Sequence, residues 1–425
     1  MQQVIVIGGG VIGLTSAWWL LEAGFGVTLL EQEPVVAAGA SHSNGGQLSY
    51  RYVAPFAGQG VPLKAMQWLF QQDGPLRFRP EADRRQWRWL AQFLAHCRAD
   101  ISRRTTARLL ALGELSRQSL VQLEIALPRA QFAWREAGKL VVYRSPRQFA
   151  AAVAGAAGVG QTSTAQADAG QVLTPSQCVA LEPALGPALA GAPGLLAGGI
   201  YNSGEAVADC QAFCHALLAR LQVHPRFGGM VHARARGFVL ANGNIAGIDT
   251  DTGLLSADAF VLAAGIRSRD LAATAGIYLP LYPIKGYSLT APIRAGDLAP
   301  QVSVTDFERK VLYARIGDRL RVAAMADIVG DSAHIDPRRV AGLIAQVRTM
   351  MPHAADYGTL TAWAGLRPAT PGGAPLIGAT PYKNLWLNVG HGGLGFTFAC
   401  GSAHILADLM RGKAPPIPMD GLTLA

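Results

Sequence analysis

The chain has 425 residues, of which 50% are hydrophobic and 15% charged, so it can bury a large core and exceeds the size of one ordinary domain. Its net charge of +9 comes mostly from arginines scattered along the sequence, and neither a lysine/arginine-rich block nor a nucleic-acid-binding motif appears. We therefore expect two domains and no nucleic-acid partner.

Cysteine usage and the N-terminal residues favour a cytoplasmic location. The five cysteines are sparse, and only Cys210 and Cys214 are closely spaced, so no zinc-binding pattern forms and we predict no metal site. We interpret them as buried thiols in a reducing compartment. The apolar run near the N-terminus follows no basic region and is interrupted by glycines, which argues against a signal peptide or a membrane span.

The segment 4–31, VIVIGGGVIGLTSAWWLLEAGFGVTLLE, has the pattern of a strand, a tight turn, a helix and a second strand. Gly8, Gly10 and Gly13 match G-x-G-x-x-G, in which the first glycine permits the turn, the second admits a pyrophosphate and the third packs the helix on the strand. The helix N-terminus offers N–H groups to the phosphates. Glu31 ends the second strand, where its carboxylate can accept ribose hydroxyls and would repel a 2′-phosphate. The segment therefore predicts FAD or NAD, and not NADP.

A loop rich in Gly, Ser and Asn follows at 37–49, AAGASHSNGGQLS, where a nicotinamide enzyme would normally continue with further strand–helix units. Small and amide residues can lie along an extended ligand, although the same composition suits a flexible surface loop. Two distant segments favour the ligand. One is 257–265, ADAFVLAAG, a strand that ends in small residues, and the other is 388–395, NVGHGGLG, a second glycine-rich turn before a helix. Together they favour FAD over NAD.

The stretch 62–104 interleaves large apolar side chains with basic ones. Trp68, Phe70, Trp87 and Trp89 are accompanied by many arginines. This composition suits a helix that lies at an anionic lipid interface. It equally suits the core face of ordinary amphipathic helices, so both interpretations stay open.

Motifs spread over the whole chain resemble those of the FAD-dependent D-amino acid oxidase and dehydrogenase superfamily, and within it the small, flavin-carrying subunit of bacterial D-amino acid dehydrogenase. The stretches GVPLKAMQWLF and IKGYSLT are not general flavoprotein features, so they carry the likeness to the dehydrogenase branch. The matching stretches, in chain order, are VIVIGGGVIGLTSAWWL, SHSNGGQLS, APFAGQGVPLKAMQWLF, ADCQAF, YPIKGYSLT, MADIVG, WAGLRPATPGGAPLIGAT and LNVGHGGLGFTFACGSAHILADL.

This resemblance implies an α/β fold, α+β overall, in which a Rossmann-like FAD-binding domain is interleaved with an antiparallel-sheet substrate domain. The stretch 62–104 would be helical and face a membrane or a partner, and the low-complexity run 155–171 would be a mobile surface connection. The implied FAD-binding domain comprises residues 1–60, 205–280 and 363–425, and the implied substrate domain comprises 61–204 and 281–362.

For the substrate, the resemblance points first to Arg367 in WAGLRPATPGG, which corresponds to the family position whose guanidinium clamps a carboxylate. A surface arginine in a turn is the alternative. Tyr287, Tyr50 and Tyr52 are candidates for further catalytic contacts, although each alone is also explained as a packing aromatic. Tyr50 and Arg51 depart from the family's less bulky, uncharged run at this point, which leaves the substrate preference open.

Around the cofactor, no catalytic acid or base is evident. We interpret His42 as a hydrogen-bonding spacer and His391 as part of the flavin surroundings. Asp209, in ADCQAF, is predicted to cap the following helix. The implied cofactor-binding residues are Gly8, Gly10, Val11, Ile12, Gly13, Glu31, Gln32, Ser41, His42, Ser43, Asn44, Gly45, Gly46, Gln47, Val231, Ala263, Ala264, Gly265, Gly365, Arg367, Gly390, His391, Gly392, Gly393, Leu394, Gly395, Phe396 and Thr397.

The implied reaction is the oxidative deamination of D-amino acids to 2-oxo acids and ammonia, by hydride transfer from the substrate Cα to N5 of the flavin. The electrons would pass to a quinone or another respiratory acceptor. The protein would be cytoplasmic, or peripheral on the cytoplasmic face of the inner membrane, with or without a partner subunit. A dehydrogenase or oxidase of cyclic imino acids such as D-proline or hydroxyproline is one alternative, and an accessory subunit that only relays electrons is another.

Overall fold

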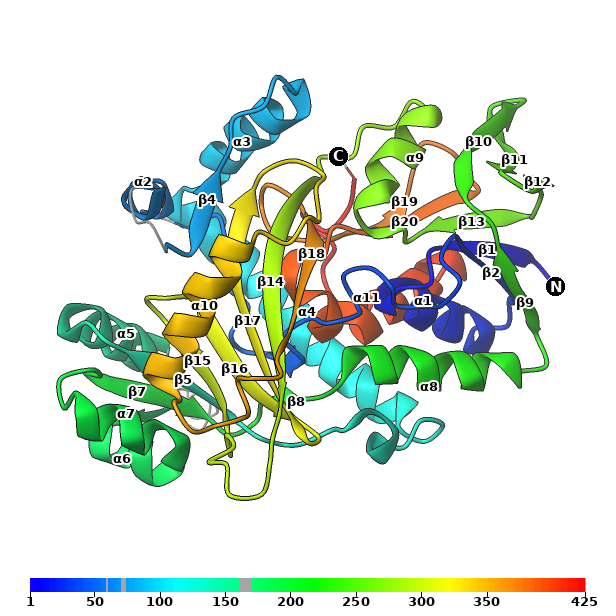
Figure 1. Cartoon of the computed structure of the whole chain (residues 1–425). Coiled ribbons are helices and arrows are strands. Elements are labelled where there is room, and N and C mark those ends of the chain that lie inside the picture. Colours follow the sequence, from blue (N-terminus) through cyan, green and yellow to red (C-terminus); the bar gives the residue numbers. More distant parts are fainter. Residues whose placement is uncertain (59, 70–73, 160–169, 425) are drawn as a thin grey trace.

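The computed structural model describes residues 1–58, 60–69, 74–159 and 170–424, which fold around two large β-sheets that lie side by side (Figure 1). Most of the run 155–171 lies outside these residues, as does Phe70. The described part of that run begins with residues 155–159, which end helix α5 (Pro146–Val159) rather than forming a loop.

The first sheet runs in the order β19 (Leu376–Ala379), β20 (Leu385–Val389), β13 (Ala259–Leu262), β1 (Gln3–Ile7), β2 (Gly26–Glu31) and β9 (Phe227–His232). Its strands are parallel except for β19. Residues 4–7 of β1 are buried on both faces, as a continuous β-branched run predicts for a central parallel strand.

Different layers cover the two faces of this sheet. Val4 and Val6 of β1 join a core formed with helices, whereas Ile5 and Ile7 point to the opposite face, in keeping with the period of two in a strand. The helices are α1 (Val11–Glu22), α4 (Ala99–Leu123), α8 (Cys210–Gln222) and α11 (Gly395–Met410). The opposite face is covered by β10 (Ala235–Ala241), β11 (Asn244–Thr250), β12 (Gly253–Leu255) and α9 (Ser268–Thr274).

The second, nine-stranded sheet is antiparallel except for the pairs β15–β5 and β17–β4. It runs in the order β18 (Thr361–Ala369), β14 (Tyr282–Pro292), β17 (Arg319–Ile328), β16 (Val311–Ile316), β15 (Ser303–Asp306), β5 (Lys139–Tyr143), β7 (Gly198–Asn202) and β6 (Gln171–Leu173), with β4 (Leu76–Phe78) beside β17.

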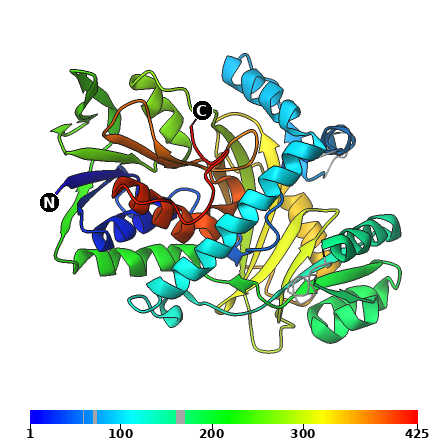
Figure 2. The ribbon, with the colours of Figure 1, turned by 180° about the vertical axis from the view of Figure 1, so that it is seen from behind.

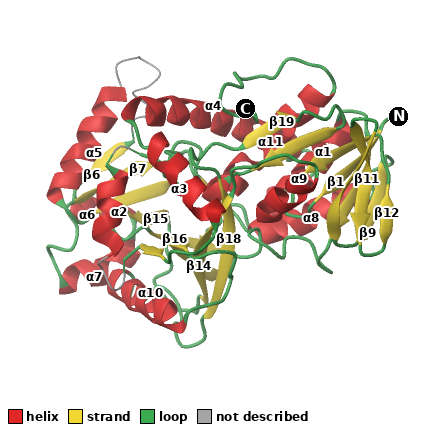
Figure 3. Ribbon diagram, turned by 90° about the horizontal axis from the view of Figure 1, so that it is seen from above, coloured by secondary structure: helices red, strands yellow, loops and turns green. Residues whose placement is uncertain are grey.

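Alternate residues of the second sheet face in opposite directions. Tyr287 and Leu289 of β14 point to an outer core formed with α10 (Pro337–Met350), α6 (Pro175–Leu181) and η2 (Pro183–Leu185), beside which lies α7 (Gly186–Gly191) (Figures 1 and 3). Because side chains alternate along a strand, Gly286 and Ser288 face the other way, toward the first sheet. This inner face forms one wall of the candidate site.

Two shorter helices, α2 (Val61–Leu69) and α3 (Arg84–His96), project at the edge of the molecule (Figure 1). No residue of α2 is buried, and only Gln86 and Trp89 of α3 are. The remaining elements are η1 (Arg129–Phe132), the turns η3 (Gly265–Arg267) and η4 (Gly392–Leu394), and the short pair of β3 (Gln47–Leu48) and β8 (Ala206–Val207).

The structure differs from the predicted domain boundaries in two places. Strand β18 belongs to the second sheet, although 363–425 is predicted as part of the FAD-binding domain. Helix α4 crosses the back of the molecule (Figure 2) and buries Leu109, Leu112 and Leu120 in the core of the first sheet, although 61–204 is predicted as substrate domain. The apolar stripe of a helix gives no information about which neighbour it packs against, so its partner is not readable from the sequence.

The helix cap at Asp209 and the state of the cysteines agree with their predictions. Asp209 caps α8, since its Oδ1 accepts from Gln211 N and Ala212 N at 2.9 and 3.0 Å, and its Oδ2 accepts from Arg319 of β17 at 3.0 Å. All five cysteines are free, and all except Cys97 are buried.

Helix α11 is apolar along most of its length. Among the described residues, Gly392–Met410 is the one helical stretch long and apolar enough to cross a membrane, judged by length and composition, and 61% of it is buried inside the protein. Its neighbours α1 and α4 cover it, so it is accounted for as a core helix.

We predict that Gly401→Ala disrupts the contact between α11 and α4. A Cβ at Gly401 would lie 2.8 Å from the backbone nitrogen of Ser116, so the helices must separate, and overpacking of this kind costs about 1–3 kcal/mol. Equilibrium denaturation measures the loss. Gly155→Ala in α5, where a Cβ meets nothing within 4 Å, is the matched control and should be neutral or slightly stabilising. Equal stability of the two variants would contradict the packing.

Candidate active site

One continuous cavity of about 2210 Å³ extends from the carboxyl ends of the parallel strands to the inner face of the second sheet. A site for one small molecule usually has about 300–1,000 Å³, so this cavity has room for an extended ligand and a second, smaller one. The carboxyl ends of parallel strands are the usual ligand-binding edge of such sheets.

The glycine turn after β1 has the geometry that a dinucleotide site requires. Gly8 has a φ of +114°, and a Cβ there would lie 2.6 Å from the carbonyl oxygen of Ala263. A Cβ at Gly13 would lie 1.7 Å from the Gly8 carbonyl oxygen, so only glycine lets α1 pack on the turn. At Gly10 a Cβ would meet only the hydroxyl of Ser41, at 3.4 Å, and would otherwise point into the cavity. The N-terminus of α1 is thus open to an anion.

Glu31 lies at the end of β2 beside this turn and lines the cavity. Its Oε2 accepts from Gly9 N at 2.5 Å and its Oε1 accepts from Glu33 N at 2.9 Å. Each carboxylate oxygen can accept more than one hydrogen bond, so the group stays available to ribose hydroxyls.

Residues 44–47 are held against the inner face of the second sheet. The carbonyl oxygen of Asn44 accepts from Arg321 Nη1 at 2.7 Å. A Cβ at Gly45 would lie 3.2 Å from Leu312, and one at Gly46 would lie 2.3 Å from Ile316, so the loop lies very close to the sheet. The sequence left open whether this loop is a flexible surface segment, and these contacts fix it between the two sheets.

The second glycine-rich turn connects β20 to α11. His391 is buried there, its Nε2 is 3.1 Å from Ser402 Oγ, and burial lowers the pKa of its imidazole to about 3. The ring is therefore neutral at physiological pH and is unsuited to carrying a proton.

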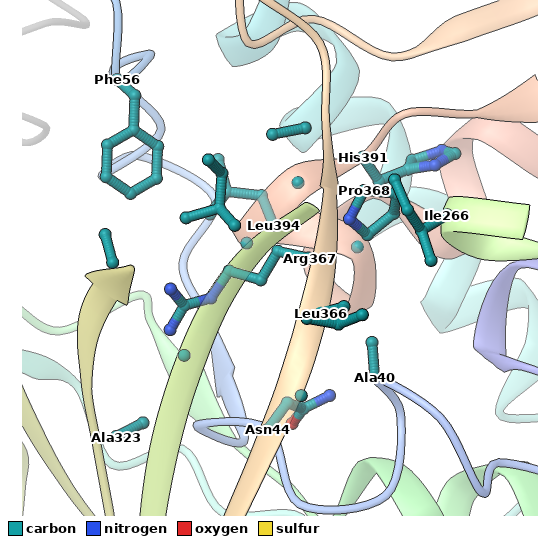
Figure 4. Close-up of a pocket in the computed structure, with 18 of the residues that line it drawn as sticks. Ala40, Asn44, Phe56, Ile266, Ala323, Leu366, Arg367, Pro368, His391 and Leu394 are labelled. Atoms are coloured by element: carbon teal, nitrogen blue, oxygen red, sulfur yellow. The ribbon is translucent and has the colours of Figure 1, made fainter. Parts of the chain in front are cut away.

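Arg367 extends from β18 across β14 on the inner face of the second sheet (Figure 4). Its Cζ would lie 2.4 Å from a Cβ at Gly286, so the guanidinium rests directly on the glycine backbone. Its Nη1 donates to the Met325 carbonyl oxygen at 2.7 Å. Burial lowers the pKa of Arg367 to about 10, against the opposing influence of Asp327, so the group stays charged at neutral pH.

The carbonyl that holds Arg367 is supplied by an irregularity in β17. The register between β14 and β17 shifts between Lys285 and Tyr287, and Met325 has a φ of +68°. Left-handed backbone is uncommon for a residue with a side chain, and such strain gathers at functional sites. The irregularity turns the Met325 carbonyl toward the guanidinium.

The three candidate tyrosines occupy different places. Tyr287 points to the outer core, on the face opposite Arg367, and its hydroxyl has no hydrogen-bond partner among the described residues. Tyr50 is buried in the core of the first sheet, where burial raises the pKa of its phenol well above the usual value. Tyr52 and Tyr287 both border the cavity, and the ring of Tyr52 lies under Lys139 Nζ at 4.2 Å. The side chains of Tyr287 and Tyr50 therefore pack in the two cores rather than beside Arg367.

Most of the predicted cofactor residues line the cavity, and four do not. Gly13 packs on Gly8, and Thr397 Oγ1 accepts from the backbone nitrogen of Ser49 at 3.2 Å. His42 stacks on Trp363 at 6.1 Å between ring centroids. Val231 packs in β9, and the neighbouring Ala233 and Ala235 line the cavity in its place.

The sequence analysis does not single out several residues that line the cavity. Lys139, Ser288, Thr305 and Met325 lie on different strands of the second sheet, and only the pairing of those strands places them on one cavity wall. Gly286 lies in the motif IKGYSLT, and its glycine is the available signal. The missed residues are Ser49, Lys139, Gly286, Ser288, Thr305, Phe307, Lys310 and Met325.

Comparison with known proteins identifies the cofactor. Residues 3–409 match the model of a family described as FAD dependent oxidoreductase. The chain belongs to the family of FAD-dependent oxidoreductases. Within its relatives, the chain is 47% identical over 421 residues to D-amino acid dehydrogenase 2 of Pseudomonas aeruginosa, with 99% of this chain and 98% of the relative covered. It is 44% identical over 432 residues to D-amino acid dehydrogenase 2 of Ralstonia nicotianae, with both chains fully covered.

Among solved structures, the fold is similar to that of glycine oxidase from Geobacillus kaustophilus. The TM-score is 0.72 at 20% sequence identity, and 100% of this chain and 99% of that chain are covered. This likeness concerns the fold of the FAD-dependent oxidoreductase and agrees with the predicted mixed α/β class.

The cavity of this FAD-dependent oxidoreductase fits its cofactor. A Cβ at Gly265 or at Gly392 would meet nothing within 4 Å, so the backbone is exposed to the cavity at both turns. Asn388 is buried at the cavity wall, and its Oδ1 has no hydrogen-bond partner among the described residues. Buried polar atoms are normally satisfied, so this one is available to a ligand. Together with the turn at Gly8 and Glu31, these features suit FAD.

We predict that Gly10→Ala weakens FAD binding without unfolding the protein. The added methyl group would point into the cavity where the pyrophosphate is expected, whereas its only near neighbour is Ser41 Oγ at 3.4 Å. The flavin-to-protein absorbance ratio after purification should fall at least severalfold, with an unchanged circular dichroism spectrum. Gly191→Ala, at which a Cβ meets nothing within 4 Å, is the control. Full FAD content in Gly10→Ala would place the pyrophosphate elsewhere.

Proposed function

We propose that this protein oxidises D-amino acids to imines, which hydrolyse to 2-oxo acids and ammonia. The observation that carries the proposal is the fixed guanidinium of Arg367 on the cavity wall. The names of the two relatives above, both D-amino acid dehydrogenases, support the choice of substrate class.

Arg367 is suited to hold the substrate carboxylate. Its guanidinium has five N–H donors in a planar fork, and one of its nitrogens, Nη1, is used to bond the Met325 carbonyl. The other donors can bind a carboxylate in the bidentate geometry that orients as well as attracts it. Because Gly286 has no side chain, the guanidinium lies flat on the sheet and leaves the space in front of it open.

Hydride acceptance is the chemistry that FAD supplies when bound. The chain's own residues orient the substrate, and orientation is a large part of catalysis in such reactions. The imidazole at the cavity wall, His391, is neutral and is engaged with Ser402. We therefore propose that the substrate amine binds neutral or releases its proton to water.

We propose a quinone or a similar membrane acceptor for the electrons, and peripheral attachment to the inner membrane through α2 and α3. Four exposed apolar side chains line the cavity beside these helices, and Leu63 of α2 is exposed as well. The five residues, Phe56, Leu63, Met66, Trp87 and Leu94, are 51–72% exposed. Exposed apolar side chains of this number mark a contact surface. Lys64, Arg84 and Arg88 add positive charge, which suits anionic headgroups.

The proposed reaction is tested by anaerobic mixing of the FAD-loaded protein with single amino acids. We expect D-alanine and other D-amino acids to bleach the flavin absorbance, and their L-enantiomers to leave it unchanged. A panel that includes D-proline separates primary amines from cyclic imino acids. If no amino acid of either hand reduces the flavin, the enzyme function is wrong and an electron-relay role takes its place.

Variants of the carboxylate site make the same test specific. Arg367→Ala removes charge-assisted hydrogen bonds worth about 1.5–3 kcal/mol, so kcat/KM should fall at least tenfold. Gly286→Ala keeps the arginine but places a methyl group where the guanidinium lies, so it should cause a similar loss. Both variants should retain FAD. Arg147→Ala, at an exposed position of α5, is the control, and unchanged kinetics in Arg367→Ala would contradict the role of the guanidinium.

The membrane proposal predicts binding to vesicles that contain anionic lipid and a decrease on polar substitution of α2. Leu63→Ser combined with Met66→Ser should reduce the vesicle-bound fraction severalfold, because both side chains are exposed, at 72% and 60%. Ile125→Ser, at a residue that is 90% exposed elsewhere on the surface, is the matched control. Equal binding of all three proteins would exclude α2 as the contact.

The electron acceptor is tested by reoxidation of the reduced flavin. Rapid reoxidation by oxygen, with none by a soluble quinone, would contradict a quinone as the acceptor.

A further inference from the structure

The inner face of the second sheet forms a regular grid above the cavity. Ser288, Ala323, Leu312 and Thr305 lie in one row across β14, β17, β16 and β15, since each is paired with the next. Lys310 lies in the turn before β16, two residues before Leu312, and Met325 lies two residues after Ala323 on β17. Because these two strands are antiparallel and Arg367 is bonded to the Met325 carbonyl, Arg367 and Lys310 both lie toward the same end of this row.

Two strand spacings separate these cations. The guanidinium of Arg367 lies over Gly286 of β14, and Lys310 directly precedes β16, with β17 between them. Adjacent strands lie about 4.8 Å apart, so the separation is on the order of 10 Å. Both residues line the same cavity, so one small molecule can contact them at opposite ends.

The positive charge of Lys310 is not balanced by an ion pair with a carboxylate among the described residues. Its Nζ lies 3.8 Å from the centroid of the Phe307 ring, and no ion pair joins it to a carboxylate in the part of the chain that the structure describes. Burial, and then the nearby Lys64, lower the pKa of its ammonium to about 8. A partly desolvated cation without an anionic partner is costly, and an anionic ligand removes that cost.

The acidic groups around Lys310 are already engaged. Glu308 accepts from the backbone nitrogens of Arg144 and Ser145 at 3.0 and 3.1 Å. Asp306 is buried and bonded to the Arg144 guanidinium at 2.7 Å. The charge at this end of the cavity is therefore not neutralised by its own carboxylates alone.

An unsatisfied hydroxyl lies on β15, the strand next to the one that Lys310 precedes. Thr305 lines the cavity, is 8% exposed, and its Oγ1 has no hydrogen-bond partner among the described residues. Ser288 lies in the same row and is 2% exposed, and its Oγ also has no hydrogen-bond partner among the described residues. Buried hydroxyls without partners on a cavity wall indicate that a polar ligand satisfies them.

Lys139 has a different role, although it too lines this end of the cavity. Its Nζ donates to Gln47 Oε1 and Ser49 Oγ, both at 2.9 Å, and it is 3% exposed. These bonds tie β5 to the loop that follows β2. We therefore treat Lys139 as a residue that positions this loop and Lys310 as the cation that is free to bind a ligand.

We propose that the cavity holds a subsite for a side-chain carboxylate, formed by Lys310 with the Thr305 hydroxyl, and that the substrates it selects are acidic D-amino acids, D-glutamate in particular. This inference rests on the proposed function, because Arg367 is taken to hold the α-carboxylate. A molecule with a carboxylate at each end is the class that matches two cations on the order of 10 Å apart, and glutamate separates its carboxylates further than aspartate does.

The test compares D-glutamate with D-glutamine, which has the same shape and no side-chain charge. For the FAD-loaded native protein we expect kcat/KM to be at least tenfold higher with D-glutamate. Lys310→Met should reduce this ratio at least tenfold, while kcat/KM for D-alanine changes less than twofold. Lys383→Met, at an exposed residue outside the cavity, is the matched control and should leave the ratio unchanged.

A binding measurement without turnover accompanies the kinetics. Glutarate should perturb the flavin absorbance at lower concentration than butyrate, and Lys310→Met should abolish the difference. If D-alanine reduces the flavin but D-glutamate is no better than D-glutamine, or if Lys310→Met leaves their ratio intact, the subsite is wrong and the proposed function stands. If no D-amino acid reduces the flavin, both are wrong.

Discussion

The contact between residues 44–47 and the inner face of the second sheet is the constraint on which the site depends. It joins two sheets with separate cores, and it does so through backbone, since Asn44 offers its carbonyl to Arg321 and the two glycines lie against Leu312 and Ile316. Side chains on these glycines would push the sheets apart. The cavity has a fixed depth because this contact sets the distance between its two walls.

A second constraint fixes the charge on the cavity wall. An arginine on a sheet normally extends into solvent, but Arg367 lies flat because Gly286 has no Cβ and because Met325 turns its carbonyl toward the guanidinium. Left-handed backbone at Met325 costs on the order of 1–3 kcal/mol, which the surrounding strands must offset. The Met325 carbonyl orients the guanidinium of Arg367. Because this side chain is already ordered before the substrate binds, less conformational entropy is lost on binding.

Local sequence signals predicted those parts of the site that are local in space. The glycines at 8, 10 and 13 and the cap at Asp209 act within a few residues of where they stand, so their spacing was sufficient. Arg367 was located through its motif, and the structure supplies the two contacts that orient it.

Residues whose role depends on strand pairing could not be predicted in this way. Tyr287 lies next to Gly286 in a recognisable motif, but neighbouring strand residues face opposite sides, and the tyrosine is on the outer one. Ser288, Thr305 and Lys310 share a wall only because β14, β17, β16 and β15 are adjacent. The packing partner of helix α4 could not be predicted for the same reason. Its leucines suit the core of either sheet, and only the position of the neighbouring α11 decides which core they join.

Part of the positive charge of this protein lies in its interior. Arg321 is buried against the loop backbone, Arg367 and Lys310 face the cavity, and burial lowers the pKa of all three. Cations in such places destabilise the empty protein, because removal from water is not repaid by a carboxylate. The ligands expected here, a pyrophosphate and a carboxylic acid, are anions. A carboxylate bound at Arg367 relieves part of this cost, so its binding stabilises the folded chain.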